Sequence, residues 1–117
     1  MYLKNKYTKW YFSIIENSKF RILPVNTSIE KHHILPKSLG GDNSKFNIAN
    51  LTPREHFVCH FLLTKMTTGV NKAKMVNAAL RLSNDKKGRC VNSKIYEIIK
   101  NERRAYLKTL KGSKSPS

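Results

Sequence analysis

The sequence predicts a small α+β fold that is mostly helical. Apolar residues recur at helical spacing near the amino terminus and in three segments of the second half. Between them lie two short segments typical of strands, separated by a loop that contains Gly-Gly. A chain of 117 residues has the length of one domain, so we expect a single domain over residues 1–110 and a flexible basic tail over 111–117.

The first expected helix covers residues 8–19. Apolar side chains follow the spacing i, i+3, i+4, i+7, i+8, which places them on one face. That face consists of Tyr7, Trp10, Tyr11, Ile14 and Ile15. The spacing favours a place in the core for Trp10 and Tyr11, although both rings are also candidates for stacking on nucleic-acid bases.

Two short strands and a helix are expected next. Residues 29–35 read as a strand that Pro36 ends, residues 37–47 as a loop, and residues 47–51 as a second strand. The helix then begins with a capping box and runs to about residue 67. The box is formed by Thr52 as N-cap, Pro53 at the first helical position and Glu55 three residues after the cap.

Two further helices are expected over residues 71–83 and 94–110, joined by a turn at 83–89. The apolar face of the first holds Ala73, Val76, Ala79 and Leu80. That of the second holds Ile95, Ile98, Ile99, Tyr106 and Leu110, with many Lys and Arg residues facing outward.

Charge is the strongest signal in the composition. Lys and Arg number 23 against 7 Asp and Glu, a formal net charge of +16. Such an excess favours nucleic acid as the partner. No apolar run reaches the length of a membrane span and no secretory signal is recognisable, so we expect no membrane partner. Cys59 and Cys90 form no Cys-x-x-Cys pair, which excludes a cysteine-rich zinc site, and we expect reduced thiols rather than a disulfide.

All four histidines lie in the strand–loop–strand–helix segment. His56 and His60 are four residues apart on the expected helix, so their rings share a face and can chelate one ion. The order of residues between them departs from the His-Glu-x-x-His pattern of zinc proteases. Side chains alternate along a strand, so one ring of the adjacent pair His32 and His33 can face the ion while the other faces water or substrate.

These histidines belong to the segment HHILPKSLGGDNSKFNIANLTPREHFVCH. It resembles the HNH nuclease motif of the ββα-metal superfamily, with a match over about residues 29–62. The spelling LTPREHFVCHFLL is especially similar to small phage-encoded homing-type HNH endonucleases. The resemblance implies a core over about residues 29–67, made of a short antiparallel β-hairpin plus a helix and flanked by one helix before it and two after it.

The resemblance also implies a role for each residue of the site. His33 corresponds to the general base, and Asn47 to the catalytic-site asparagine that ties the loop to the first strand and holds the base in place. Asn50, three residues on, is a competing candidate for that asparagine, although Asn47 has the usual separation of nine residues from the helix histidine. The implied metal ligands are His32, His56 and His60.

One divalent ion is therefore expected, of open identity among Mg²⁺, Mn²⁺, Zn²⁺, Ni²⁺ and Co²⁺. Three imidazoles, a set that resembles the colicin-type DNases, suit the transition metals better than Mg²⁺. Glu30 lies two residues before His32 and is either a support for that ring or a surface charge. Cys59 is either a buried small residue or a fourth ligand.

The expected activity is hydrolysis of phosphodiester bonds in double-stranded DNA. The resemblance implies 5′-phosphate and 3′-hydroxyl products and a place in the cytoplasm of a phage-infected bacterial cell. Lys37 and Arg54 are candidates for DNA binding or ordinary solvated charges. The sequence leaves open nicking against double-strand cleavage, monomer against homodimer, and homing against restriction, packaging or toxin roles. The alternative function is a non-catalytic basic nucleic-acid-binding protein with a structural metal site.

Overall fold

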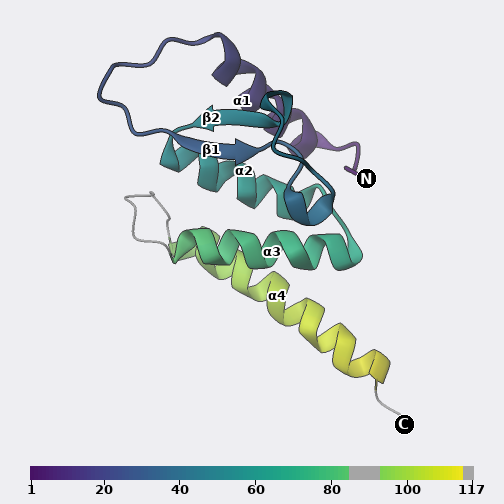
Figure 1. Ribbon diagram of the computed structural model, residues 1–117. Helices are drawn as coiled ribbons and strands as arrows, with labels where there is room; N and C mark the ends of the chain where they lie inside the picture. The colour runs from purple at the N-terminus through teal and green to yellow at the C-terminus, as the bar shows by residue number, and fades with distance from the viewer. Residues whose placement is uncertain (85–92, 115–117) are drawn as a thin grey trace.

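The computed structural model describes residues 1–84 and 93–114, without the side chains of Ser93, Tyr106 and residues 109–114. Its order of elements confirms the α+β fold with a two-stranded hairpin among helices (Figure 1). The helices are α1 (Lys6–Phe20), α2 (Pro53–Lys65), α3 (Gly69–Ser83) and α4 (Ser93–Lys114). The strands are β1 (Glu30–His33) and β2 (Ile48–Leu51), and the loop between them contains short 3₁₀ helices at Lys37–Leu39 and Lys45–Asn47.

The two strands pair antiparallel, as expected from the motif. Their register places Glu30 opposite Leu51 and His32 opposite Ala49. Helix α2 packs on both strands and on α1, while α3 packs between α2 and α4 (Figure 1). The hairpin and α2 therefore form the centre of the molecule, with α1 on one side and the pair α3–α4 on the other.

Two groups of buried apolar side chains hold these layers together. The first joins α1, the hairpin and α2, and includes Tyr11, Ile15, Leu51, Leu63 and Met66. The second joins α2, α3 and α4, and consists of Phe57, Val76, Ala79 and Ile99. Burial of each large apolar side chain contributes about 1.5–3 kcal/mol, so these groups dominate the stability of the fold.

The expected place of Trp10 in the core is wrong. Its side chain is 52% exposed, whereas Tyr11 and Ile15 are fully buried. Adjacent residues on a helix point about 100° apart, so the buried stripe centred on Tyr11 leaves Trp10 at its edge. There the indole packs edge-on against Tyr7 and lies beneath the Lys6 ammonium group.

Helices α1 and α4 are longer than the sequence pattern indicated. Helix α1 begins at Lys6 because the Asn5 side chain accepts a hydrogen bond of 3.0 Å from the Thr8 backbone N–H. Helix α4 continues to Lys114, so residues 111–114 are helical rather than part of the expected tail. The expected inward positions of Tyr106 and Leu110, most of the turn at 83–89, and Cys90 lie outside the described residues.

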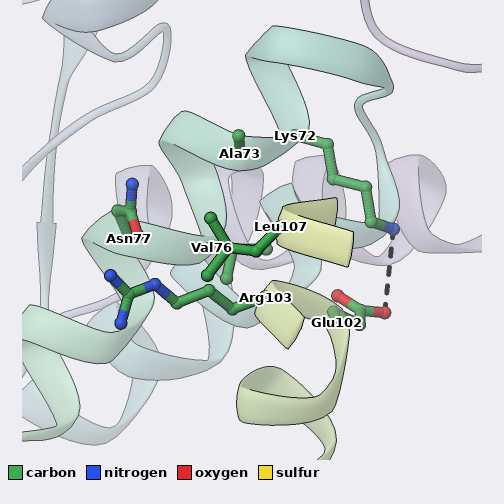
Figure 2. A pocket seen from close by; sticks show the side chains of 7 residues that line it. All are labelled: Lys72, Ala73, Val76, Asn77, Glu102, Arg103 and Leu107. Carbon is green, nitrogen blue, oxygen red and sulfur yellow. Dashed lines mark ion pairs between the residues drawn. The ribbon is translucent and has the colours of Figure 1, made fainter. Parts of the chain in front are cut away.

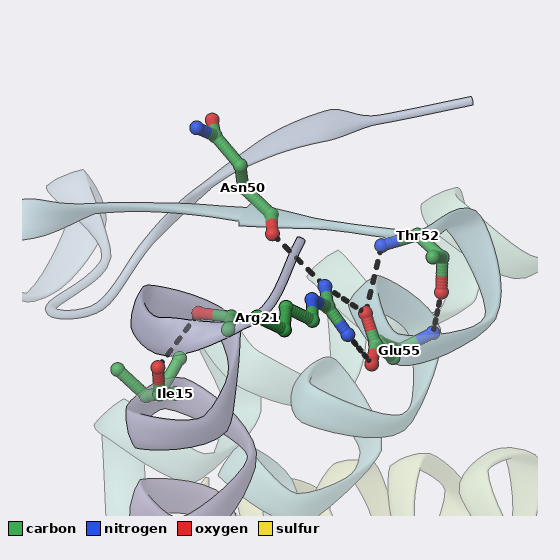
Figure 3. A network of polar contacts seen from close by, with 6 residues as sticks. Ile15, Arg21, Asn50, Thr52 and Glu55 are labelled. Carbon is green, nitrogen blue, oxygen red and sulfur yellow. Dashed lines mark hydrogen bonds and ion pairs between the residues drawn. The ribbon is translucent and has the colours of Figure 1, made fainter. Parts of the chain in front are cut away.

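A polar network secures the first turn of α2 (Figure 3). The expected capping box is present, with Thr52 accepting from the Glu55 N–H and the Glu55 carboxylate accepting from the Thr52 N–H. The Arg21 guanidinium, at the end of α1, binds both Glu55 carboxylate oxygens and donates to the Asn50 carbonyl of β2. One arginine thus connects α1, β2 and the start of α2.

Helices α3 and α4 are joined by apolar packing and by ion pairs. A cavity of about 90 Å³ lies between them. Ala73, Val76 and Leu107 are among the residues that line it (Figure 2). Glu102 of α4 pairs with Lys72 of α3 at 3.7 Å and with Lys65 of α2. Among the described residues, no helix combines the length and apolar character that a membrane crossing requires.

Replacement of Arg21 by Met should lower the free energy of unfolding by roughly 1–3 kcal/mol, because the Glu55 carboxylate loses a partly buried bidentate partner. Chemical denaturation of the two proteins measures this difference. Lys19→Met is the matched control, since Lys19 is an exposed cation in the last turn of the same helix.

The effect of the Arg21 substitution should depend on pH. The hydrogen bond from Arg21 holds the pKa of Glu55 below its ordinary value of 4.5. The stabilisation is therefore complete at neutral pH and is lost as the pH falls below 4.5 toward the lower folded-state pKa. A difference between the two proteins that stays constant from pH 7 to pH 3 would contradict this explanation.

Candidate metal centre

Three histidine side chains from two elements converge on one point. His32 comes from β1, and His56 and His60 come from α2. Each offers one ring nitrogen, and these nitrogens lie within 4.8 Å of one another. The ring centroids are 5.2 Å apart for His32 and His56, 5.1 Å for His32 and His60, and 4.9 Å for His56 and His60. This is the convergence that a three-imidazole metal site requires.

Local structure explains why the rings meet. His32 is the inward-facing residue of β1, and its partner in register is the small residue Ala49. The capping box begins α2 directly after β2, so the helix packs against the hairpin that precedes it. The spacing of four residues stacks His56 and His60 on one face of α2, next to β1.

His32 has the properties of a metal ligand. Its side chain is 1% exposed, and burial, followed by the neighbouring His60 and His56, lowers its pKa to about 2. The ring is therefore neutral at physiological pH and keeps a lone pair. Its Nδ1 atom is buried without a hydrogen-bond partner, while Nε2 lies 2.7 Å from the Tyr11 hydroxyl. A buried nitrogen without a partner, beside two other imidazoles, fits a bound cation.

Glu30 is not an isolated surface charge, which was one of the two alternatives left open by the sequence. Its carboxylate lies 2.8 Å from Nδ1 of His56, and both side chains are largely buried. The sequence alternative placed this support on His32, whereas the structure places it on His56. A carboxylate that accepts from Nδ1–H orients the ring and leaves Nε2 to the cluster.

The loop between the strands is closed by Asn47. Its Oδ1 accepts from the Leu35 N–H at 2.8 Å, and its Nδ2 donates to the Leu35 and Asp42 carbonyls at 2.9 Å each. Gly41 lies so close to this contact that a Cβ atom there would be 1.7 Å from the Leu35 carbonyl oxygen. Gly40 adopts a φ of +102°, which favours glycine. Asn50, the competing candidate, has an exposed side chain outside this contact.

His33 lies beside the cluster without being one of its three members. Its side chain is half-buried, and its Nε2 lies 2.8 Å from Oδ1 of Asn43. The resemblance implied that Asn47 ties the loop to the first strand and holds this ring. Its amide does bond to the backbone of Leu35 and Asp42, and the side chain in contact with the ring is Asn43. Asn43 was missed, because nothing in the sequence distinguishes it from an ordinary turn asparagine.

An open pocket of about 260 Å³ lies beside His33 and the two helix histidines. Its lining consists of Lys31, His33, Pro36, Lys37, His56 and His60. Lys37 is therefore at the site, whereas Arg54 is exposed and outside this lining. Lys31 was not predicted, although its spacing of two residues from His33 on one strand places both side chains on the same face.

Cys59 confirms the expectation of a buried small residue. It lies between the two helix histidines in sequence but is fully buried in the first apolar group, outside the cluster of ligands. Burial raises the pKa of its thiol to about 12. Among the described residues, the side chains placed to hold one ion are the three histidines, so the candidate site offers imidazole nitrogens.

Proteins with similar sequences carry the name endonuclease. The chain is 44% identical to the probable mobile endonuclease D of Enterobacteria phage T4, over 51% of this chain and 24% of that protein. It is 40% identical to the probable mobile endonuclease E of the same phage, over 51% of this chain and 42% of that protein. It is 32% identical to the probable mobile endonuclease C of that phage, over 74% of this chain and 40% of that protein. The expected resemblance to phage-encoded endonucleases is confirmed.

This chain spans less than half the length of each of these relatives. No family model matches the chain. No solved structure matches it either.

Replacement of Glu30 by Ala should weaken binding of Co²⁺ by about 10–100-fold, because the His56 ring loses the carboxylate that orients it. Isothermal titration calorimetry measures this change. Glu30→Gln keeps an acceptor at the same position and should retain most of the affinity. Glu16→Ala, which removes an exposed carboxylate from α1, is the control for net charge. Equal affinities in wild type and Glu30→Ala would show that Glu30 has no influence on the centre.

Proposed function

We propose that this chain is a metal-dependent DNA endonuclease of the HNH type, which hydrolyses phosphodiester bonds in double-stranded DNA. One observation carries the proposal. Three imidazole nitrogens lie within 4.8 Å of one another, and a fourth imidazole, that of His33, lines an open pocket together with two members of the trio, His56 and His60. A cation site beside an unligated histidine is the combination that metal-assisted hydrolysis needs.

His33 is the proposed general base. Its Nε2–H donates to the side-chain oxygen Oδ1 of Asn43, so the lone pair of the neutral ring is on Nδ1. From there the ring accepts a proton from a water molecule as that water attacks phosphorus in line with the departing 3′ oxygen. The bond between phosphorus and the 3′ oxygen breaks, which leaves a 5′-phosphate and a 3′-hydroxyl. Asn43 orients the base, and Asn47 keeps the loop that carries Asn43 close to β1.

His32, His56 and His60 are the proposed ligands of one divalent ion. When bound, such an ion would offset the negative charge that builds up on the phosphate in the transition state. A set of three imidazoles favours Zn²⁺, Ni²⁺, Co²⁺ or Mn²⁺ over Mg²⁺, which prefers oxygen ligands. The physiological ion is therefore proposed to be a transition metal.

The substrate is proposed to bind through its phosphates. Lys31 and Lys37 line the pocket next to His33, where each can contact a phosphate on either side of the scissile bond. Exposed Arg54, in the first turn of α2, is a further candidate contact. The net charge of +16 adds attraction for any DNA backbone, and this attraction falls steeply as salt is added.

The relatives support the biological setting. They are named mobile endonucleases and belong to a bacteriophage, and the matched segments cover half or more of this chain. We therefore propose a phage-encoded, homing-type nuclease that acts in the cytoplasm of the infected bacterial cell. The alternative, a non-catalytic DNA-binding protein with a structural metal, gives no purpose to His33 in an open pocket.

The variant His33→Ala should abolish nicking or cleavage of plasmid DNA while binding Co²⁺ with nearly wild-type affinity, because the ring is outside the ligand trio. Gel electrophoresis of supercoiled plasmid measures the first quantity and calorimetry the second. EDTA should abolish wild-type cleavage, and added Co²⁺ or Mn²⁺ should restore it. Cleavage by His33→Ala at the wild-type rate would disprove the assignment of the base.

The variant His56→Ala should lose both metal affinity and cleavage, because it removes one of three ligands. DNA affinity, measured by gel retardation in EDTA, should change little. A protein that retards DNA but cuts none with any of the metals above would support the non-catalytic alternative. Undiminished cleavage by the chelator-treated His56 variant would contradict the metal role.

A further inference from the structure

The hydroxyl group of Tyr11 connects α1 to the candidate metal centre. Its oxygen lies 2.7 Å from Nε2 of His32 and 2.7 Å from the carbonyl oxygen of Ile34. The Tyr11 side chain is fully buried, and His32 is 1% exposed. Water therefore does not compete for these contacts, and the three groups must satisfy one another.

The number of protons decides the direction of each hydrogen bond. A carbonyl oxygen only accepts, so the single Tyr11 hydroxyl proton is used in the contact with Ile34. The Tyr11 oxygen then has lone pairs but no proton for His32. The contact at 2.7 Å is consequently a hydrogen bond in which Nε2–H of His32 donates to the Tyr11 oxygen.

We infer that Tyr11 is a positioning residue that holds His32 as its Nε2–H tautomer, so that Nδ1 is the atom this ring offers to the cation. The inference rests on the proposed metal centre. It assigns a part in that centre to α1 (Lys6–Phe20), which lies outside the motif at residues 29–62. It also explains why Nδ1 is buried without a hydrogen-bond partner.

The opposite arrangement leaves a buried group unsatisfied. In that arrangement the Tyr11 hydroxyl would donate to an unprotonated Nε2 of His32, and the Ile34 carbonyl would lose the Tyr11 proton. The proton of His32 would then be on Nδ1, where the described residues provide no acceptor. A buried N–H without an acceptor is costly, and a protonated nitrogen does not bind a cation.

The ring of His56, a second candidate ligand, is also oriented by a hydrogen-bond acceptor, but through Nδ1 instead of Nε2. Glu30 accepts from Nδ1 of His56 at 2.8 Å, which leaves Nε2 of that ring for the cation. The strand histidine therefore presents Nδ1 and the helix histidine presents Nε2. A neutral acceptor on one ring and a charged acceptor on the other fix the two tautomers before any ion binds.

The chain offers a matched control for Tyr11. The Tyr2 hydroxyl donates to the same Ile34 carbonyl at 2.9 Å, and Tyr2 has no hydrogen bond to His32. In Tyr11→Phe, Tyr2 keeps this carbonyl paired, and in Tyr2→Phe, Tyr11 does so. Each substitution removes one tyrosine hydroxyl from the same cluster. Only Tyr11→Phe removes the acceptor for His32.

The first test uses the metal-free, ¹⁵N-labelled chain. Long-range ¹H–¹⁵N correlation spectra should show His32 protonated on Nε2 alone in the wild type and in Tyr2→Phe. In Tyr11→Phe, the nitrogen signals should move toward those of a mixture of tautomers. A cross-peak between the Nε2 proton and the Tyr11 ring protons tests the contact in the wild type without any substitution.

The second test measures affinity for Co²⁺ by calorimetry. Tyr11→Phe should bind about 10–100-fold more weakly than wild type, the usual loss when the partner of a metal-binding histidine is removed. Tyr2→Phe should bind within about twofold of wild type. A loss of affinity in both variants alike would show a general effect of disturbing the cluster and would overturn the specific role of Tyr11.

Two further results would overturn the inference. One is a wild-type His32 protonated on Nδ1, and the other is an unchanged tautomer and affinity in Tyr11→Phe. A wild type that binds no Co²⁺ would instead contradict the proposed metal centre. The spectra of the metal-free chain would still decide whether Tyr11 controls the tautomer of His32.

Discussion

The closure of the β1–β2 loop by a single side-chain amide is the constraint on which the candidate site depends. Asn47 binds both backbone groups of Leu35 and the carbonyl of Asp42, and Gly41 leaves the space that this contact needs. The loop is therefore held to the end of β1, where the two adjacent histidines lie. Because β2 leads directly into the capped helix α2, the same contact determines how the strand histidine meets the helix histidines.

Around this loop, polar groups that would otherwise be costly to bury are paired with one another. Tyr11 contacts His32, Glu30 contacts His56 and Asn43 contacts His33, so each of these imidazole rings has a partner that orients it. Each of these partners comes from a different part of the chain. The orientation of these rings thus depends on the whole layer formed by α1, the hairpin and α2.

The parts of this structure that depend on short-range spacing could be predicted from the sequence. The capping box, the Gly-Gly loop and the pair of histidines four residues apart each report a local geometry, and their combination indicated the hairpin, α2 and the convergence with His32. The pairings across elements could not be predicted. Whether Glu30 supports one ring or another depends on the packing of β1 against α2, and Trp10 was misplaced because helical spacing alone does not locate the centre of a buried stripe.

Cys59 lies between two of the candidate ligands in sequence, yet its thiol points into the apolar core, and burial raises its pKa to about 12. Thiolates are the form of cysteine that oxidants and soft cations attack, and this cysteine does not ionise near neutral pH. Cys59 therefore adds no readily oxidised thiolate to the helix that carries two of the candidate ligands. Cysteine-ligated centres lose their ligands when thiolates are oxidised, and a centre built on three imidazoles lacks that route of inactivation.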